Sequence, residues 1–136
     1  QAIAGSHILQ KVEAITIARN YNASLYDKAL ADVKEITIPP RPGKEVRQAF
    51  HTYVVLTERR DELKAYLLER GVQCAIHYPI PVHLQKGYAY LGYKRGDFPN
   101  VEYQADHQLT LPIHEYLKDE QIRYVVECVK DFYTKR

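Results

Sequence analysis

The sequence has no methionine and no tryptophan, and only two cysteines among its 136 residues. Cys74 and Cys128 lie far apart inside apolar segments, which favours buried free thiols over a disulfide and indicates a reducing, cytoplasmic setting. No apolar run approaches the ~18 residues of a membrane-spanning helix, so we expect no membrane partner. A chain without an initiating methionine that starts inside a helical pattern is expected to be a fragment of a longer protein.

The charges are nearly balanced, with 19 Lys and Arg against 17 Asp and Glu. A nucleic-acid-binding domain usually has a concentrated basic surface, so we expect no nucleic-acid partner. Hydrophobic residues make up 46% of the chain and charged residues 26%, which is typical of a globular domain. A chain of this length is long enough to bury a hydrophobic core.

The hydrophobic periodicity predicts an α+β fold. We expect one long N-terminal helix over residues 2–30 and a small, largely antiparallel sheet of three to four strands with flanking helices. Proline and glycine positions set several of the boundaries. We expect strands over residues 36–38, 51–57, 72–77 and 109–111. Further helices are expected over residues 60–70, 84–93, 99–107 and 119–133. In the short helix over 84–93, Tyr88 and Leu91 are expected to face inward.

The segment CAIHYPIPVHLQ (residues 74–85) carries two histidines, His77 and His83, on either side of two prolines. Three interpretations remain open: a metal site, a stiff turn, and a preorganised loop that faces a substrate. A zinc site needs three or four ligands, and no further ligand lies near at motif spacing, so we expect no metal. The chain also has no phosphate-binding glycine loop and no nucleophile motif. We therefore expect no catalytic residue here.

Several longer segments occur in an order that resembles the C-terminal part of the DegT/DnrJ/EryC1/StrS sugar aminotransferases. These segments are HYPIPVHLQKGYAYLGYKRGDFPN and LTLPIHEYLKDEQIRYVVECVKDFY, preceded by QAIAGSHILQKVEAI and FHTYVVL. In that family a Tyr-Pro-x-Pro-x-His-Leu-Gln stretch leads to a Gly-Asp-Phe-Pro element. A Leu-Ser/Thr-Leu-Pro strand and a terminal helix then follow. The resemblance covers nearly the whole chain.

The resemblance implies a homodimeric enzyme that uses pyridoxal 5'-phosphate (PLP). Such an enzyme moves an amino group from glutamate or glutamine to a keto carbon of a nucleotide-linked sugar. The lysine that forms a Schiff base with PLP would lie upstream in a large domain, so this chain alone would be inactive and would have no cofactor-binding residue. Residues 1–35 would form the helix and connection that leave that domain, and residues 36–136 would form the C-terminal small domain.

By the same resemblance, Tyr78, Pro79 and His83 match the family motif and would line the sugar side of the active-site cleft. His83 would contact a sugar hydroxyl or the diphosphate, and Gln1 would approach the cleft from the start of the first helix. Two alternatives stay open: a non-catalytic dimerisation or regulatory module of the same fold, and a PLP-dependent sugar dehydratase. The sugar, its aminated carbon and the nucleotide are not determined, although the motif leans towards the 3-amino sugar branch.

Overall fold

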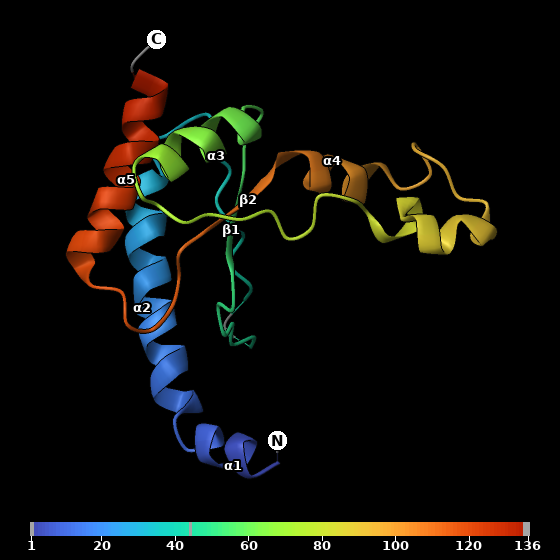
Figure 1. Ribbon diagram of the computed structural model, residues 1–136. Coiled ribbons are helices and arrows are strands. Elements are labelled where there is room, and N and C mark those ends of the chain that lie inside the picture. The colour runs from blue at the N-terminus through green and yellow to red at the C-terminus, as the bar shows by residue number, and fades with distance from the viewer. Residues whose placement is uncertain (1, 44, 135–136) are drawn as a thin grey trace.

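The computed structural model describes residues 2–43 and 45–134 and has an α+β architecture, as the sequence predicts. Gln1, one of the expected site residues, lies outside the described residues. Figure 1 shows a body of packed helices and strands, with a separate arm that projects from it. The elements in chain order are α1 (Ala2–Leu9), α2 (Val12–Leu30), β1 (Tyr53–Leu56), α3 (Arg60–Glu69), η1 (Val82–Leu84), η2 (Lys86–Leu91), α4 (Pro99–His107), β2 (Gln108–Leu111) and α5 (Asp119–Thr134).

The core lies where α2, α3 and α5 pack beside the paired strands β1 and β2. These strands are antiparallel, with Tyr53 opposite Leu111 and Val55 opposite Leu109. All four of these side chains are buried. Helix α5 buries one face at helical spacing, as its apolar pattern predicts. The residues of that face are Ile122, Val125, Val126, Val129 and Phe132.

The sheet has two strands rather than the three to four that the sequence predicts. The two outer segments are reduced to single bridges, one between Thr37 and Leu56 and one between Ala75 and Thr110. On one side of each bridge, the next hydrogen-bonded pair would need a proline N–H, at Pro39 opposite β1 or at Pro112 beyond β2. Proline has no such donor, so neither ladder extends in that direction.

The N-terminal helix is divided, whereas the sequence predicts a single helix over residues 2–30. Helix α1 ends at Leu9 and α2 begins at Val12. No residue of α1 is buried, whereas the second half of α2 places Ala23, Tyr26 and Leu30 in the core. Neither proline nor glycine occupies the break, and nothing in the local sequence explains it. Packing of α2 against α5 therefore fixes only the second part of the predicted helix.

We define the arm as residues 78–107, which include η1, η2 and α4 (Figure 1). The helix expected over residues 84–93 consists instead of two short 3-10 segments. Gly92 ends the second with a left-handed φ of 76°, a conformation that glycine adopts without a Cβ clash. The prediction that Tyr88 and Leu91 face inward is wrong, because the arm extends away from the body and both side chains are exposed.

Candidate functional site

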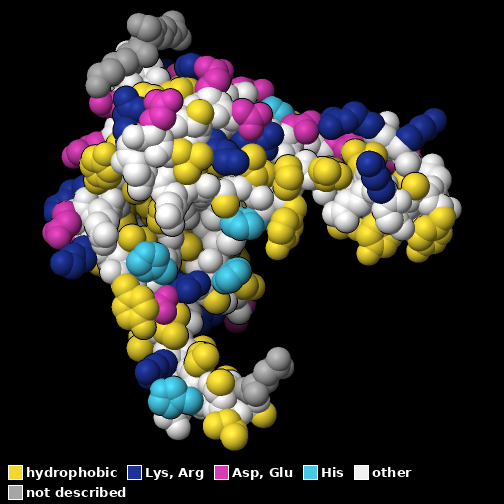
Figure 2. Space-filling view, viewed as in Figure 1, with side chains coloured by type: hydrophobic (Ala, Val, Ile, Leu, Met, Phe, Trp, Pro, Cys, Tyr) yellow, Lys and Arg dark blue, Asp and Glu magenta, His cyan; other side chains and the backbone are white. Residues whose placement is uncertain are grey.

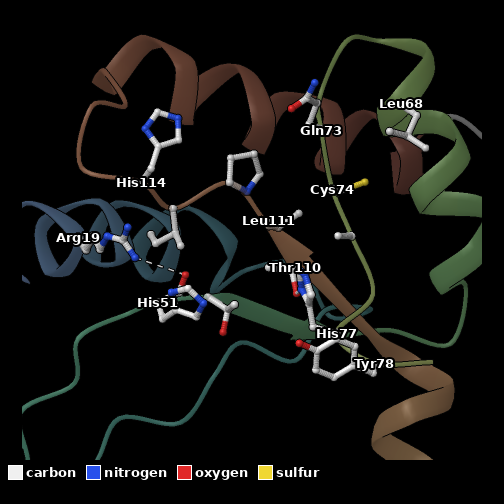
Figure 3. Close-up of a pocket in the computed structure, with 14 residues that line it drawn as sticks. Arg19, His51, Leu68, Gln73, Cys74, His77, Tyr78, Thr110, Leu111 and His114 are labelled. Atoms are coloured by element: carbon white, nitrogen blue, oxygen red, sulfur yellow. Dashed lines mark hydrogen bonds between the residues drawn. The ribbon is translucent and has the colours of Figure 1, made fainter. Parts of the chain in front are cut away.

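A large pocket lies between the body and the base of the arm, and its volume is about 860 Å³. It is formed by α2, the segment before β1, the segment that leads into the arm, and the end of β2. Figure 3 shows the side chains that line it. The polar and aromatic residues among them are Arg19, His51, Thr52, Gln73, His77, Tyr78, Thr110 and His114.

His77 is held in this pocket by the end of β2. Its Nδ1 atom lies 2.9 Å from the Thr110 hydroxyl, and the bridge between Ala75 and Thr110 fixes the backbone two residues before it. One ring nitrogen of His77 is therefore engaged by the protein. The Gln108 side chain donates to the Tyr78 carbonyl at 2.9 Å, which ties the next residue to the same strand.

Arg19 joins two histidine-bearing segments of the pocket to α2. Its guanidinium donates to Glu115 at 3.0 and 3.2 Å, and also to the backbone carbonyls of Phe50 and His51 at 3.4 and 3.5 Å. Charge-assisted hydrogen bonds of this kind are stronger than neutral ones. Arg19 therefore fixes the segments from which His51 and His114 enter the pocket (Figure 3).

The backbone at Phe50 has a φ of +46°, a left-handed conformation that is unusual for a bulky residue. The buried Phe50 ring and the guanidinium of Arg41, 4.2 Å from the ring centroid, hold this residue in place. A second α2 side chain, Asn22, donates to the His114 carbonyl at 3.0 Å. The path of the chain around His51 and His114 is thus set by contacts from α2 and the core.

The pocket is suited to binding a polar ligand but lacks the groups that PLP needs. Three imidazoles can each donate or accept a hydrogen bond, and Arg19 is already neutralised by Glu115. None of the 14 residues that line the pocket, all in the described part of the chain, is a lysine, an aspartate or a glutamate. The residues present thus do not supply a Schiff-base amine or an acidic partner for the pyridine nitrogen. The described residues also contain no cluster of three His, Cys, Asp or Glu that could hold a metal ion.

The structure separates the site residues that the sequence groups together. Tyr78 lines the large pocket and a smaller neighbouring one, and its side chain is 72% exposed. Pro79 is exposed beside it but lines neither pocket. His83 also does not line the large pocket. Its ring is packed inside the arm, 4.8 Å between centroids from Phe98.

His83 is instead part of a network around Glu102. The His83 Nε2 atom lies 3.0 Å from Oε1 of Glu102, and both side chains are less than one tenth exposed. The Glu102 carboxylate also accepts the backbone N–H of Gly96 at 2.8 Å and that of Phe98 at 3.3 Å. Burial alone would raise the pKa of Glu102, but these hydrogen bonds outweigh burial and lower it. The network closes the turn that carries the Gly-Asp-Phe-Pro element.

Sequence reasoning missed three contributors to the pocket: Arg19, Thr110 and His114. Arg19 and Glu115 are 96 positions apart, so no local pattern connects them. In the sequence, His77 stands out only as one of a pair with His83. Its position at the end of the strand expected over residues 72–77 was the available signal, because residues at strand ends often line binding sites.

The fold and the pocket together define a small α+β protein with a pocket large enough for a small ligand. The chain belongs to the DegT/DnrJ/EryC1/StrS aminotransferase family, which matches residues 1–130.

Similar proteins are found among both curated sequences and solved structures. The chain is 39% identical to a pleiotropic regulatory protein of Geobacillus stearothermophilus, over 87% of this chain and 32% of that protein. It is 35% identical to a dTDP-3-amino-3,4,6-trideoxy-alpha-D-glucose transaminase of Streptomyces venezuelae, over 84% of this chain and 30% of that protein. A crystal structure of S. venezuelae DesV in complex with a ketimine intermediate superposes with a TM-score of 0.88 at 33% identity, covering 94% of this chain and 34% of that chain.

The chain spans about a third of the length of these relatives. A second solved structure, an aminotransferase of the same family from Brucella abortus, superposes with a TM-score of 0.83 at 32% identity, over 93% of this chain and 33% of that one. Among the described residues, none of the helices is both long enough and apolar enough to cross a bilayer.

Proposed function

We propose that this chain is the C-terminal small domain of a PLP-dependent aminotransferase that acts on nucleotide-linked keto-sugars. In this proposal residues 36–136 form the small domain, and residues 1–35 form the helical connection from a large domain. The large domain supplies the lysine and the acidic residue that the pocket lacks, and the parent enzyme is a homodimer that uses glutamate or glutamine as amino donor. PLP supplies the electron sink for the transfer.

One observation carries the proposal. The family matches residues 1–130, and within that match His77 and Tyr78, the first two residues of the motif segment, line the large pocket. Relatives named as transaminases of dTDP-linked amino sugars include those of S. venezuelae and Aneurinibacillus thermoaerophilus, both named for a 3-amino sugar. These names support a nucleotide-linked substrate and the 3-amino branch.

The residues of this chain have binding roles in the proposal. Tyr78 lines the sugar side of the cleft, with its hydroxyl available to a ligand because the residue is largely exposed. Pro79, which lines neither pocket of this chain, is assigned to the same side only as the neighbour of Tyr78. The family resemblance implies a direct contact between His83 and the substrate, but the Nε2 atom of His83 is engaged by Glu102. A contact between His83 and substrate therefore requires its Nδ1 atom or a change in the arm.

The test uses the full-length gene product. Purified protein mixed with PLP should develop the visible absorption band of a lysine Schiff base, and borohydride should abolish that band. The loaded enzyme is then assayed with glutamate or glutamine against a panel of nucleotide keto-sugars, scored by mass spectrometry for amino-sugar product. A gene that encodes no residues beyond these 136, or a folded full-length protein without the band, would contradict the proposal.

Replacing Tyr78 with phenylalanine refines the assignment. If the hydroxyl binds the sugar, the substitution raises KM for the nucleotide sugar several-fold and leaves the PLP band unchanged. Tyr124→Phe is the control, because this tyrosine lies outside the large pocket and its hydroxyl donates to the Arg70 carbonyl. Equal KM values for the two variants would remove Tyr78 from the site.

A second candidate is a regulatory or dimerisation module without transfer activity. The name of the G. stearothermophilus relative, a pleiotropic regulatory protein, favours keeping this alternative. The same absorbance experiment separates the two, because a non-catalytic module needs no lysine Schiff base. A sugar dehydratase would release no amino sugar in the assay.

A further inference from the structure

Three histidines line the large pocket, and the proposed function gives none of them a role. His51 enters from the segment before β1, His77 from the segment that leads into the arm, and His114 from the segment after β2 (Figure 3). All three are exposed, and Figure 2 shows histidine side chains on the part of the body that lies between the arm and α1. The fold therefore brings half of the six histidines of the chain to one open pocket.

The three rings keep nitrogen atoms available to a ligand. Among the described residues, the His51 ring makes no hydrogen bond, and the Nε2 atoms of His77 and His114 make none either. A shared metal ion does not account for the arrangement, because the described part of the chain has no group of three ligands that could hold one. These nitrogens are therefore free to contact a ligand that enters the pocket.

The contacts on the protein side of each ring indicate which nitrogen carries the proton. Nδ1 of His114 accepts the backbone N–H of Tyr116 at 3.3 Å, so the proton of the neutral ring is on Nε2. Nδ1 of His77 lies 2.9 Å from the Thr110 hydroxyl. When that hydroxyl donates, Nδ1 of His77 accepts and its proton is also on Nε2. Both rings then present an N–H donor to the pocket.

The charges around the pocket favour an anion. None of the 14 lining residues, all within the described part of the chain, is acidic. Glu115 follows His114 in the chain, and its own backbone N–H and Arg19 hold the pKa of its carboxyl below the usual range. Its negative charge is paired with the Arg19 guanidinium at 3.0 Å, which weakens its repulsion of an anion in the pocket. A neutral imidazole donates an N–H and a protonated one adds a positive charge, so both forms attract an oxygen anion.

We propose that the large pocket binds an anionic oxygen group of the substrate, a carboxylate or a phosphate, through the Nε2–H donors of His77 and His114. His51 provides a third contact, and Thr110 is a positioning residue that fixes the proton of His77. The inference rests on the proposed function for its choice of ligand, because glutamate and glutamine carry carboxylates and a nucleotide-linked sugar carries phosphates. A hydrogen bond to such a group is stronger than one to a neutral hydroxyl, so the histidines act chiefly on the affinity for the anion.

The experiment measures the binding of two anions to the full-length gene product by isothermal titration calorimetry. Glutarate has the two carboxylates of glutamate but no amino group, so it cannot undergo transfer. Thymidine diphosphate represents the nucleotide, because relatives are named for dTDP-linked sugars. Glutaramide and thymidine are the matched uncharged ligands. An anion that uses the pocket should bind at least ~10-fold more tightly than its uncharged counterpart.

Substitutions of His77 separate the roles of its two nitrogens. The amide nitrogen of asparagine is as many bonds from Cβ as Nδ1, and that of glutamine is as many bonds from Cβ as Nε2. His77→Asn should therefore weaken anion binding about 10-fold, whereas His77→Gln should stay within about 3-fold of the unmodified protein. His107→Gln is the control and should leave the affinity unchanged, because His107 lies outside the large pocket and contacts Glu58.

Two variants of Thr110 test its positioning role. Thr110→Val removes the hydroxyl with little change in shape and should weaken anion binding several-fold. Thr110→Ser retains the hydroxyl and should keep the affinity of the unmodified protein. Thermal denaturation shows whether both variants fold. A purely structural role for Thr110 would change Tm without producing this difference in affinity.

The results also identify the source of the anion and separate this inference from the proposed function. Dependence of the glutarate affinity on His77 assigns the pocket to the amino donor, and dependence of the thymidine diphosphate affinity assigns it to the nucleotide. The inference is refuted when neither anion binds, when the uncharged ligands bind as tightly, or when His77→Asn binds as tightly as His77→Gln. A protein with the Schiff-base band and histidine-independent binding keeps the proposed function and loses this inference. A protein without the band whose anion binding depends on His77 does the reverse.

Discussion

Removing one hydroxyl group from each of two neighbouring core tyrosines should change stability in opposite directions. Tyr26 and Tyr53 are both fully buried, and their rings stack with centroids 4.8 Å apart. The Tyr53 hydroxyl donates to Oδ1 of Asp27 at 2.8 Å, whereas the Tyr26 hydroxyl has no hydrogen-bond partner among the described residues. Tyr26→Phe and Tyr53→Phe are therefore the same chemical change in two different hydrogen-bonding states.

The magnitudes follow from the cost of a buried polar group. An unsatisfied buried hydroxyl costs about 1–3 kcal/mol, and deleting a single oxygen leaves little empty space, so Tyr26→Phe should raise the free energy of unfolding by about 1 kcal/mol. A hydrogen bond to a charged acceptor contributes about 1.5–3 kcal/mol. Asp27 is partly exposed and keeps its ion pair with Arg41, so Tyr53→Phe should lower the free energy of unfolding by about 1.5 kcal/mol.

Thermal and urea denaturation of the 136-residue chain, followed by circular dichroism, measures both effects. For a chain of this size 1 kcal/mol corresponds to roughly 3–5 °C in Tm, so the two variants should differ by about 8–12 °C. Burial raises the pKa of both hydroxyls, so both remain protonated near neutral pH. A Tyr26→Phe variant that is less stable than the parent chain by 1 kcal/mol or more would refute the reasoning, because it would mean that a bound water satisfies this hydroxyl.

Three further predictions concern the arm, the pocket and the core. Because hydrogen bonding lowers the pKa of Glu102 below its ordinary 4.5, the contribution of this carboxylate to the arm is complete above pH 4.5 and is lost as the pH falls through the lowered pKa. The Gly96 amide shift in NMR should report that transition, and E102Q should abolish it. Arg19→Gln and Glu115→Gln should each lower the free energy of unfolding by about 1.5–3 kcal/mol, and the double variant should lose less than their sum in a thermal double-mutant cycle. Leu67→Ala, at a fully buried position of α3, should cost about 2–5 kcal/mol in urea denaturation, and a cost below 1 kcal/mol would contradict the packing described.

Most elements whose ends depend on local chemistry were predictable from the sequence. The α5 face repeats at helical spacing, Pro99 begins α4, and Gly71, with a φ of 74°, follows α3. The outer strands were not predictable in the same way. A short apolar segment has the sequence pattern of a strand, but its pairing with a neighbouring strand also needs backbone N–H donors on both segments. Pro39 and Pro112 each remove one such donor.

The candidate site was predictable only in part. The motif placed Tyr78 at the pocket, but its companion His83 is turned into the arm by Glu102, 19 positions away. Nothing in the spacing of the two histidines distinguishes a residue that faces a cleft from one that faces a carboxylate. The exposure of Tyr88 and Leu91 on the arm was also not predictable, because periodicity shows which residues share a face and not whether that face is covered.

The sequence by itself determined the family, the α+β class and the positions of the main helices, because these depend on motif order, periodicity and capping residues that are close together in the chain. Only the tertiary structure decided which polar groups meet. Arg19 reaches Glu115 across 96 positions, and His77 reaches Thr110 across 33. Such pairs depend on the path of the whole chain, and the physical reason is that a hydrogen bond is formed by proximity and geometry, which local sequence does not encode.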